Sequence, residues 1–215
     1  MSWVSVAFAC VTVLGCASAL VATRAGMQRA YAMSKTIASL GFVGTALAVG
    51  AMGSMWSSIA LGALVLSAAG DVALAVPGRR GLLVGLAFFA VAHSVYFAAF
   101  ALHGTGGVIL GAAAVGATVF AGGAWLSLRD RIPREMSKPV GVYLVIVGAM
   151  LAAGTAAGIS HRAWLLVCGV LLVAGSDIAV GRERFGDHLF ANKLLGLPAY
   201  YAGQTLIALS LAAGP

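Results

Sequence analysis

The sequence predicts an all-α, polytopic membrane protein of about eight transmembrane helices. Of its 215 residues, 61% are hydrophobic and only 9% are charged, whereas an ordinary soluble domain carries about 25% charged residues. Apolar runs of about 20 residues, the length that crosses a bilayer as a helix, follow one another along the chain. Nearly all lysines and arginines lie in alternate connections between these runs. A water-soluble fold of this length could not bury so much apolar surface.

Charges and glycine-rich or polar breaks separate the apolar runs and define the predicted helices in order. The runs cover residues 3–23, 36–53, 56–76, 81–102, 106–128, 138–158, 161–181 and 190–213. The second run is the shortest, because Gly50 and Gly53 interrupt it, and only Pro198 interrupts the last. Abundant glycine and alanine favour close helix contacts in a bilayer. We expect a single transmembrane domain that spans residues 1–215.

Basic residues set the predicted orientation. Twelve of the thirteen lysines and arginines lie in odd-numbered connections, and Arg162, in the sixth, is the exception. Cytoplasmic connections are enriched in basic residues. Both termini are therefore expected on the non-cytoplasmic side of the membrane. The same distribution accounts for the net charge of +7, so that a nucleic-acid partner is not indicated.

Two pairs of similar segments indicate an internal repeat. Met33–Lys35 resembles Met136–Lys138, and Leu66–Ala73 resembles Leu172–Ala179, at offsets of 103 and 106 residues. An even number of crossings separates the members of each pair, as in parallel repeats of transporters. We expect two four-helix halves of the same orientation, covering about residues 1–104 and 105–215.

Two aspartates inside apolar runs are the candidate catalytic residues. Asp71 and Asp177 each lie about five residues before a basic turn, which places them about 7 to 9 Å below the cytoplasmic helix end. A carboxylate at such a position costs at least about 2.5 kcal/mol and must face a polar interior. If the two carboxyls face each other, they share one proton and titrate as a unit. Such a pair supplies a general acid and a general base, whereas a purely structural role would require each to bond a neighbouring helix.

Other polar residues are candidates for the same cavity. His93 and Tyr96 share a helix face because they are three residues apart. Lys193, Tyr200 and Gln204 form one stripe along the last helix. Lys35 and Lys138 begin repeat-related runs on the predicted cytoplasmic side, where they bind a phosphate head group or extend to the interface. The candidate substrate-binding residues are Lys35, His93, Tyr96, Lys138, Lys193, Tyr200 and Gln204.

Other chemistry-bearing residues have simpler interpretations. The remaining acids, Asp130, Glu135, Glu183 and Asp187, lie in basic loops and are expected to be solvated. The three cysteines, Cys10, Cys16 and Cys168, have no spacing typical of zinc or of a disulfide framework and are interpreted as packing residues. Motifs of serine hydrolases, zinc peptidases and nucleotide-binding loops are absent from the sequence. We expect no metal and no cofactor.

Four short segments carry a resemblance to a known family. They are Ala69–Leu74, His93–Tyr96, Ser176–Ile178 and Tyr200–Ile207. In order and spacing they resemble the YhhN family of membrane proteins, which includes the animal lysoplasmalogenases, and the resemblance extends from Lys35 to Ile207. It implies a hydrolase that cleaves the vinyl ether bond of lysoplasmalogens, with Asp71 and Asp177 at the positions of the family's intramembrane aspartates. A lysophospholipid substrate and a bacterial inner membrane are then expected.

The implied chemistry divides the work between two carboxyls, as in glycosidases. One aspartic acid protonates the β carbon, and the other, ionised, stabilises the oxocarbenium ion and activates water. The sequence leaves open which aspartate has which role, and many bacteria lack plasmalogens, so that another ether lipid is an alternative substrate. A proton-coupled or small-solute transporter, an intramembrane aspartyl protease and a non-catalytic scaffold are the competing functions. The YD and GxGD motifs of the proteases are absent.

Overall fold

The computed structural model describes residues 2–186 and 189–212 as helices joined by short connections. The helices are α1 (Trp3–Arg24), α2 (Gln28–Ala48), η1 (Ala51–Gly53), α3 (Met55–Ala75), α4 (Arg79–His103), α5 (Gly107–Leu128), α6 (Arg134–Ser160), α7 (Trp164–Phe185) and α8 (Phe190–Ser210). All long elements are α-helical, and η1 is a single 3₁₀ turn between α2 and α3. The all-α prediction is confirmed in this part of the chain.

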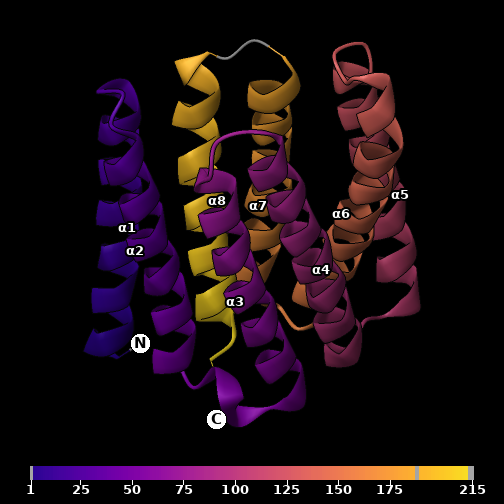
Figure 1. The fold of residues 1–215 in the computed structure, drawn as a ribbon. Coiled ribbons are helices and arrows are strands. Elements are labelled where there is room, and N and C mark those ends of the chain that lie inside the picture. Colours follow the sequence, from indigo (N-terminus) through magenta and orange to yellow (C-terminus); the bar gives the residue numbers. More distant parts are fainter. Residues whose placement is uncertain (1, 187–188, 213–215) are drawn as a thin grey trace.

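The long helices form one bundle in which successive helices run in opposite directions (Figure 1). The α1–α2, α3–α4 and α5–α6 connections lie at one end, together with the end of α7 and the start of α8. The start of α1 and the end of α8 lie at the other end. The basic residues of the odd-numbered connections are therefore gathered at one end of the bundle, which we call the basic end.

Six helices of the described residues are long and apolar enough to cross a membrane, namely α1, α3, α4, α5, α6 and α7. The other two long helices carry more polar side chains. Gln28, Arg29 and Lys35 lie in α2, and Asn192, Lys193 and Gln204 lie in α8. These two helices pack against each other, and Lys35 of α2 and Gln204 of α8 are buried in the bundle.

Two helix boundaries differ from the predicted ones and change the surroundings of charged residues. α2 begins at Gln28, eight residues before the predicted start, so Lys35 lies two turns inside the helix and is only 4% exposed. α7 continues to Phe185, so Glu183 and Arg184 belong to its last turn and not to a loop. Asp187, predicted to be a solvated loop residue, lies outside the described residues. α8 runs without a break through Pro198.

Small residues bring neighbouring helices into close contact. On α7 and α8, a Cβ atom added to Gly169 would lie 3.0 Å from the carbonyl oxygen of Gly203, and one added to Gly203 would lie 2.9 Å from the carbonyl oxygen of Gly169. Backbone contacts of this kind are typical of helix pairs in membranes. Of the three cysteines, only Cys16 is buried, so the predicted packing role is wrong for Cys10 and Cys168, which are exposed.

Candidate functional site

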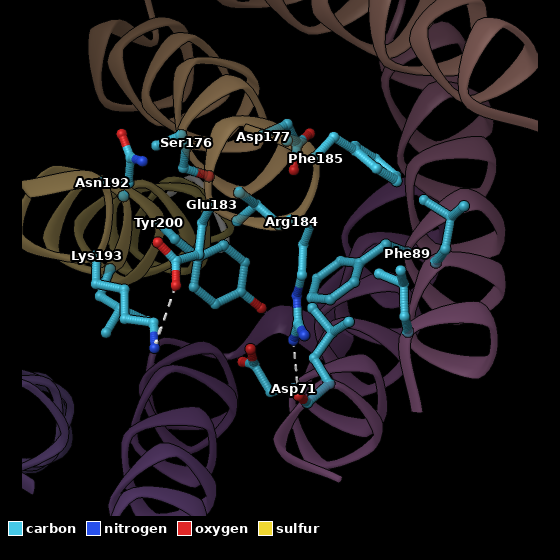
Figure 2. A pocket seen from close by; sticks show the side chains of 18 of the residues that line it. Asp71, Phe89, Ser176, Asp177, Glu183, Arg184, Phe185, Asn192, Lys193 and Tyr200 are labelled. Atoms are coloured by element: carbon cyan, nitrogen blue, oxygen red, sulfur yellow. Dashed lines mark hydrogen bonds and ion pairs between the residues drawn. The ribbon is translucent and has the colours of Figure 1, made fainter. Parts of the chain in front are cut away.

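A cavity of about 360 Å³ opens at the basic end of the bundle. Its lining comes mainly from α2, α3, α4, α6, α7 and α8, and it includes both Asp71 on α3 and Asp177 on α7. Figure 2 shows these carboxyls on different sides of the cavity, with Tyr200 of α8 and Phe89 of α4 among the walls. The helices in which the sequence analysis found candidate polar residues therefore surround a single cavity.

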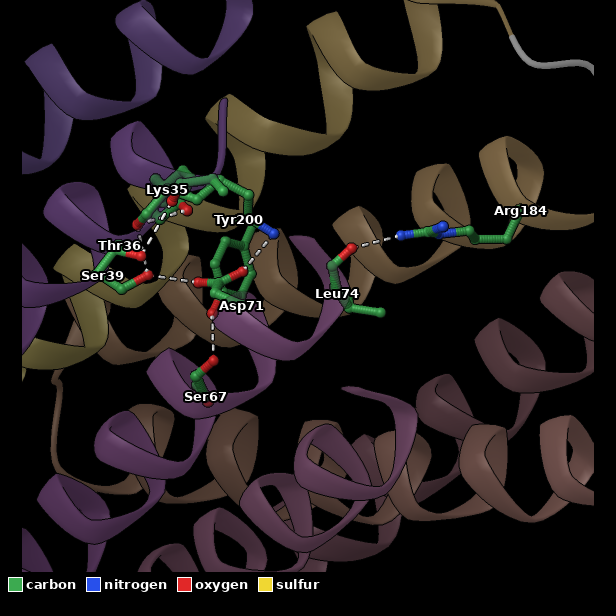
Figure 3. Close-up of polar contacts among 10 residues, drawn as sticks. Lys35, Thr36, Ser39, Ser67, Asp71, Leu74, Arg184 and Tyr200 are labelled. Carbon is green, nitrogen blue, oxygen red and sulfur yellow. Dashed lines mark hydrogen bonds and ion pairs between the residues drawn. The ribbon is translucent and has the colours of Figure 1, made fainter. Parts of the chain in front are cut away.

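Asp71 is held in an ion pair below the mouth of the cavity. Its Oδ1 atom lies 2.8 Å from Nζ of Lys35, and its Oδ2 atom accepts a hydrogen bond of 2.7 Å from Oγ of Ser39 (Figure 3). The Lys35 and Asp71 side chains are only 5% and 2% exposed. A buried carboxylate with an ammonium group and a hydroxyl donor at these distances is stabilised in its ionised form.

Aromatic side chains of α8 enclose this ion pair. Tyr201 Oη donates a hydrogen bond of 3.3 Å to the carbonyl oxygen of Lys35. Tyr200 lines the cavity and packs edge to face against Phe89 and Phe42, with ring centroids 5.8 and 6.2 Å apart. These rings keep bulk water away from Asp71 on the side of the core.

Asp177 has different neighbours. Its Oδ2 atom lies 3.5 Å from Nε2 of His93, and Tyr143 of α6 is its hydrogen-bonding neighbour. The Asp177 side chain is 12% exposed, whereas His93 is fully buried. The His93 ring is fixed from its other side, because Nδ1 lies 2.6 Å from the carbonyl oxygen of Phe89.

Each carboxyl thus has a basic partner of its own. The sequence predicts that the two aspartates reach one cavity, where a facing pair would share one proton, but no hydrogen bond joins their carboxyls within residues 2–186 and 189–212. Lys35 and Ser39 occupy both oxygens of Asp71, and His93 and Tyr143 surround Asp177. The partners of the two aspartates come from α2, α4 and α6, so only the packed bundle brings them together.

Charged groups of both signs surround the mouth of the cavity. Lys193 Nζ lies 3.4 Å from Oε1 of Glu183, and Arg184 donates a hydrogen bond of 3.0 Å to the carbonyl oxygen of Leu74. The Tyr31 ring lies near two ammonium groups, with Nζ of Lys35 and Lys193 at 5.9 and 5.6 Å from its centroid. The mouth therefore carries charges of both signs, while Leu82, Leu86 and Leu144 contribute apolar surface to the cavity wall.

The structure separates the predicted site residues into two groups. Asp71, Asp177, Lys35, Lys193 and Tyr200 line the cavity. The other four residues do not belong to its lining: they are His93, Tyr96, Gln204 and Lys138.

Tyr96 and Gln204 lie behind the cavity wall, fully buried, where Tyr96 Oη donates a hydrogen bond of 2.7 Å to Oε1 of Gln204. Lys138 is exposed on α6. Its predicted role at the cavity is therefore not supported by its position, because α6 turns this residue away from the bundle interior.

Several lining residues escaped the sequence analysis. Tyr143, Glu183 and Arg184 are the main ones, and Glu183 was expected to be solvated. A signal for Arg184 was present, because Asp177, Val180, Gly181 and Arg184 follow the spacing of one helix face and all line the cavity. Ser39, four residues after Lys35, follows the same rule. Among the described residues, His, Cys, Asp and Glu side chains form no group of three that would hold a metal ion.

Comparisons with known proteins agree in pointing to one family. The profile of the YhhN family matches residues 30–211. Lysoplasmalogenase TMEM86B of Homo sapiens is 34% identical over 162 residues, which is 74% of this chain and 66% of that protein. The TMEM86B lysoplasmalogenase of Sus scrofa is 32% identical over 163 residues, or 76% of this chain and 67% of that protein. Lysoplasmalogenase TMEM86A of Bos taurus is 30% identical over 156 residues, or 68% of this chain and 62% of that protein.

The matched region spans about two thirds of the length of these curated relatives, and slightly less in the human and bovine proteins. No solved structure matches the chain. The family match includes both aspartates, most of α2 and every later helix.

Proposed function

The chain belongs to the YhhN family, and from this membership and its cavity we propose that it hydrolyses the vinyl ether bond of lysoplasmalogen-type lysophospholipids. The products are a fatty aldehyde and the glycerophospho head group. One observation carries the proposal: two carboxyl groups from different helices, Asp71 and Asp177, line a single cavity whose wall also contains both charged and apolar side chains. The names of the relatives support the same reaction.

The reaction requires an acid and a stabilising anion. A proton is added to the β carbon of the vinyl ether, the π electrons form the new C–H bond, and the positive charge is shared between the α carbon and the ether oxygen. Asp71, kept ionised by Lys35, stabilises this oxocarbenium ion electrostatically. Asp177 supplies the proton as the general acid.

Water then completes the hydrolysis. It adds to the α carbon and loses a proton to a carboxylate, which gives a hemiacetal. The hemiacetal loses its hydroxyl proton as the C–O bond to glycerol breaks, and the glycerol oxygen takes up a proton. One water is consumed for each aldehyde and alcohol produced, and the carboxyls return to their starting state.

The cavity also suggests how the substrate lies. The phosphate of the head group binds at the mouth beside Lys193, and the alkenyl chain extends along the apolar wall that includes Leu86 and Leu144. Lys35 forms an ion pair with Asp71. In our proposal its main role is therefore to hold the catalytic carboxylate, and binding of the phosphate is a minor role.

We further propose that all eight long helices cross the membrane, with the basic end in the cytoplasm. α2 and α8 have 21 residues each, which gives a length of about 31 Å, enough for the hydrocarbon core. The cavity then opens toward the cytoplasm, and both termini lie on the other side. The positive-inside rule supports this orientation, and a bacterial inner membrane is the proposed location.

The packing supports the proposal of two parallel halves, at about residues 1–104 and 105–215. α1 packs on α2 and α3 on α4, and in the second half α5 packs on α6 and α7 on α8. Between the halves, α4 packs on α6. The helices that correspond to them in the repeat, α8 and α2, also pack on each other. Asp71 and Asp177 occupy equivalent helices in this scheme.

The proposed activity is tested with purified protein in detergent and a lysoplasmenyl lipid, scored for release of fatty aldehyde. Wild-type protein should release aldehyde, and Asp71→Asn and Asp177→Asn should each lower kcat by about 10²- to 10⁴-fold, because each removes a carboxyl from the site. Asp130→Asn is the matched control, since Asp130 is 86% exposed at the bundle end, and should keep wild-type activity.

Two results would contradict the proposal. One is wild-type protein that releases no aldehyde but carries a solute flux in proteoliposomes, which would identify a transporter. The other is unchanged aldehyde release by both aspartate variants, which would place the chemistry elsewhere in the chain.

A further inference from the structure

His93 is a buried titratable group that the proposed reaction does not use directly. The side chain is fully buried and does not belong to the lining of the cavity. Nevertheless its Nε2 atom faces Oδ2 of Asp177 at 3.5 Å. Among the residues that the structure describes, neither of these two buried atoms has a hydrogen-bond partner.

The contact with Phe89 determines which ring nitrogen of His93 carries the proton. A carbonyl oxygen only accepts hydrogen bonds, so Nδ1, at 2.6 Å from the Phe89 oxygen, must be a donor. In a neutral imidazole, Nε2 is then left with a lone pair that points toward Asp177. The backbone of α4 therefore fixes both the orientation and the tautomer of the ring.

Two acceptors that face each other in a buried site require a proton between them. An ionised Asp177 beside a neutral His93 would place two lone pairs opposite each other, at a cost comparable to that of an unsatisfied buried group. One proton on the axis from Nε2 to Oδ2 satisfies both atoms. This proton then belongs to both residues.

The surroundings of the pair contain few other titratable groups. Tyr143 of α6 contacts both members, as the neighbour of the Asp177 carboxyl and in an edge-to-face contact with the His93 ring at 5.7 Å. Tyr96 lies one helical turn further along α4. Asp71 of α3 and Tyr200 of α8 line the same cavity, and the charged groups Glu183 and Arg184 lie one to two turns beyond Asp177 on α7.

We propose that His93 is a positioning residue that shares one proton with Asp177 and thereby makes Asp177 the acid of the site. The inference rests on the proposed hydrolysis and deepens it by identifying what makes Asp177, and not Asp71, the acid. Asp71 is paired with an ammonium group that cannot accept a proton, whereas Asp177 is paired with an imidazole that keeps a proton available. The assignment follows from the partner of each carboxyl.

The proton held by the pair passes through Asp177, the only member that lines the cavity, to the β carbon of the vinyl ether. Asp177 becomes a carboxylate next to neutral His93, with Tyr143 available as a hydrogen-bond donor. The water that adds to the α carbon later releases a proton, which restores the pair. No oxidant, metal or further reactant is required.

The test compares His93→Gln and His93→Phe with wild-type protein in the aldehyde-release assay, over a range of pH. Both variants remove the shared proton, and Phe keeps the aromatic shape of the site. We expect kcat to fall about 10- to 100-fold with KM changed less than about twofold, as for other residues that orient a catalytic group. The limb of the pH–kcat profile that the pair produces should shift or disappear. His161→Gln, at the opposite end of the bundle, should leave kcat and the profile unchanged.

An infrared measurement tests the pair without any activity. Wild-type protein should show the C=O stretch of a protonated carboxyl that Asp177→Asn removes and His93→Phe shifts in frequency or in its pH dependence. If wild-type protein releases aldehyde but both His93 variants keep its pH profile, with activity lowered uniformly or not at all, His93 has only a structural role and the inference is wrong. If the wild type is inert, the proposed function fails, and the infrared result alone decides on the pair.

Discussion

At the scale of single residues, charge inside the bundle is the feature that most needs explanation. Lys35 and Asp71 are almost completely buried, and moving two such ions from water costs several kcal/mol each before their attraction is counted. Excellent geometry offsets part of this cost, because Ser39 satisfies the second carboxylate oxygen. An ion pair of this kind is weak evidence for stability and stronger evidence for a required charge.

Removing one member of this pair should therefore destabilise the protein strongly. Lys35→Met leaves a buried carboxylate without its cation, and we expect it to lower the free energy of unfolding by about 3–5 kcal/mol. The double variant Lys35→Met with Asp71→Asn should recover much of this loss, because the uncompensated charge is gone. Thermal unfolding of the purified proteins in detergent measures both effects.

Lys138→Met is the control for this comparison. Lys138 occupies the repeat-related position but is exposed, and its substitution should change the stability by no more than about 0.5 kcal/mol. Equal destabilisation by Lys35→Met and Lys138→Met would contradict the importance of the buried ion pair.

Lys35 and Lys138 are alike in the sequence, and the structure places them in different surroundings. Both follow the same Met-Ser motif, so nothing local distinguishes them. Lys35 is buried because α2 starts early and packs on α3 and α8, whereas Lys138 lies on the outer face of α6. The identity of the aspartates was predictable, since acids in apolar runs are rare and costly. Their partners were not, because each comes from another helix.

At the scale of the elements, the helices divide according to what they face. α5 is almost entirely exposed, with only Ala117, Ala124 and Leu128 buried, and its sequence is uniformly apolar. α2 and α8 are the least uniformly apolar because they supply the cavity with Lys35, Lys193 and Tyr200. Lower hydropathy in these two helices therefore reflects their position at the site.

The contact between α7 and α8 gives a prediction for helix packing. Gly203→Ala should destabilise the protein by about 1–3 kcal/mol, because its Cβ would meet the carbonyl oxygen of Gly169 and the backbone nitrogen of Val173, both at 2.9 Å. Backbone atoms cannot move aside without separating the two helices. The midpoint of thermal unfolding in detergent should fall accordingly.

A glycine on the same pair of helices provides the control. A Cβ added to Gly175 meets nothing within 4 Å, and alanine has the higher helix propensity. Gly175→Ala should therefore keep or slightly raise the unfolding midpoint. If Gly203→Ala behaved in the same way as Gly175→Ala, the close approach of α7 and α8 would not be essential.

At the scale of the whole molecule, the distribution of charge relates the cavity to the membrane. The odd-numbered connections hold most of the basic residues and lie at the end where the cavity opens. In the proposed orientation, substrate enters from the cytoplasmic leaflet. The head group remains at the charged mouth while the hydrocarbon chain stays among apolar side chains.

Topology reporters test this orientation directly. A reporter fused after Arg131, between α5 and α6, should be active in the cytoplasm, and one fused after Gly104, between α4 and α5, should be active on the opposite side. Cytoplasmic activity at Gly104 would reverse the orientation and place the cavity on the other face of the membrane. The two fusions control for each other, because only one helix, α5, separates the two sites.

The sequence by itself determined the fold class, the helical segments, the asymmetry of basic residues and the two aspartates. These features depend on composition and on the hydrophobicity of each run. Each transmembrane helix satisfies its own backbone hydrogen bonds, so a run can be recognised without knowledge of the other helices. Only the tertiary structure decided that Asp71 meets Lys35 and Ser39 while Asp177 meets His93 and Tyr143. These contacts join residues far apart in the chain, and they are fixed by how α2, α4 and α6 pack around α3 and α7, which the pattern of a single helix does not contain.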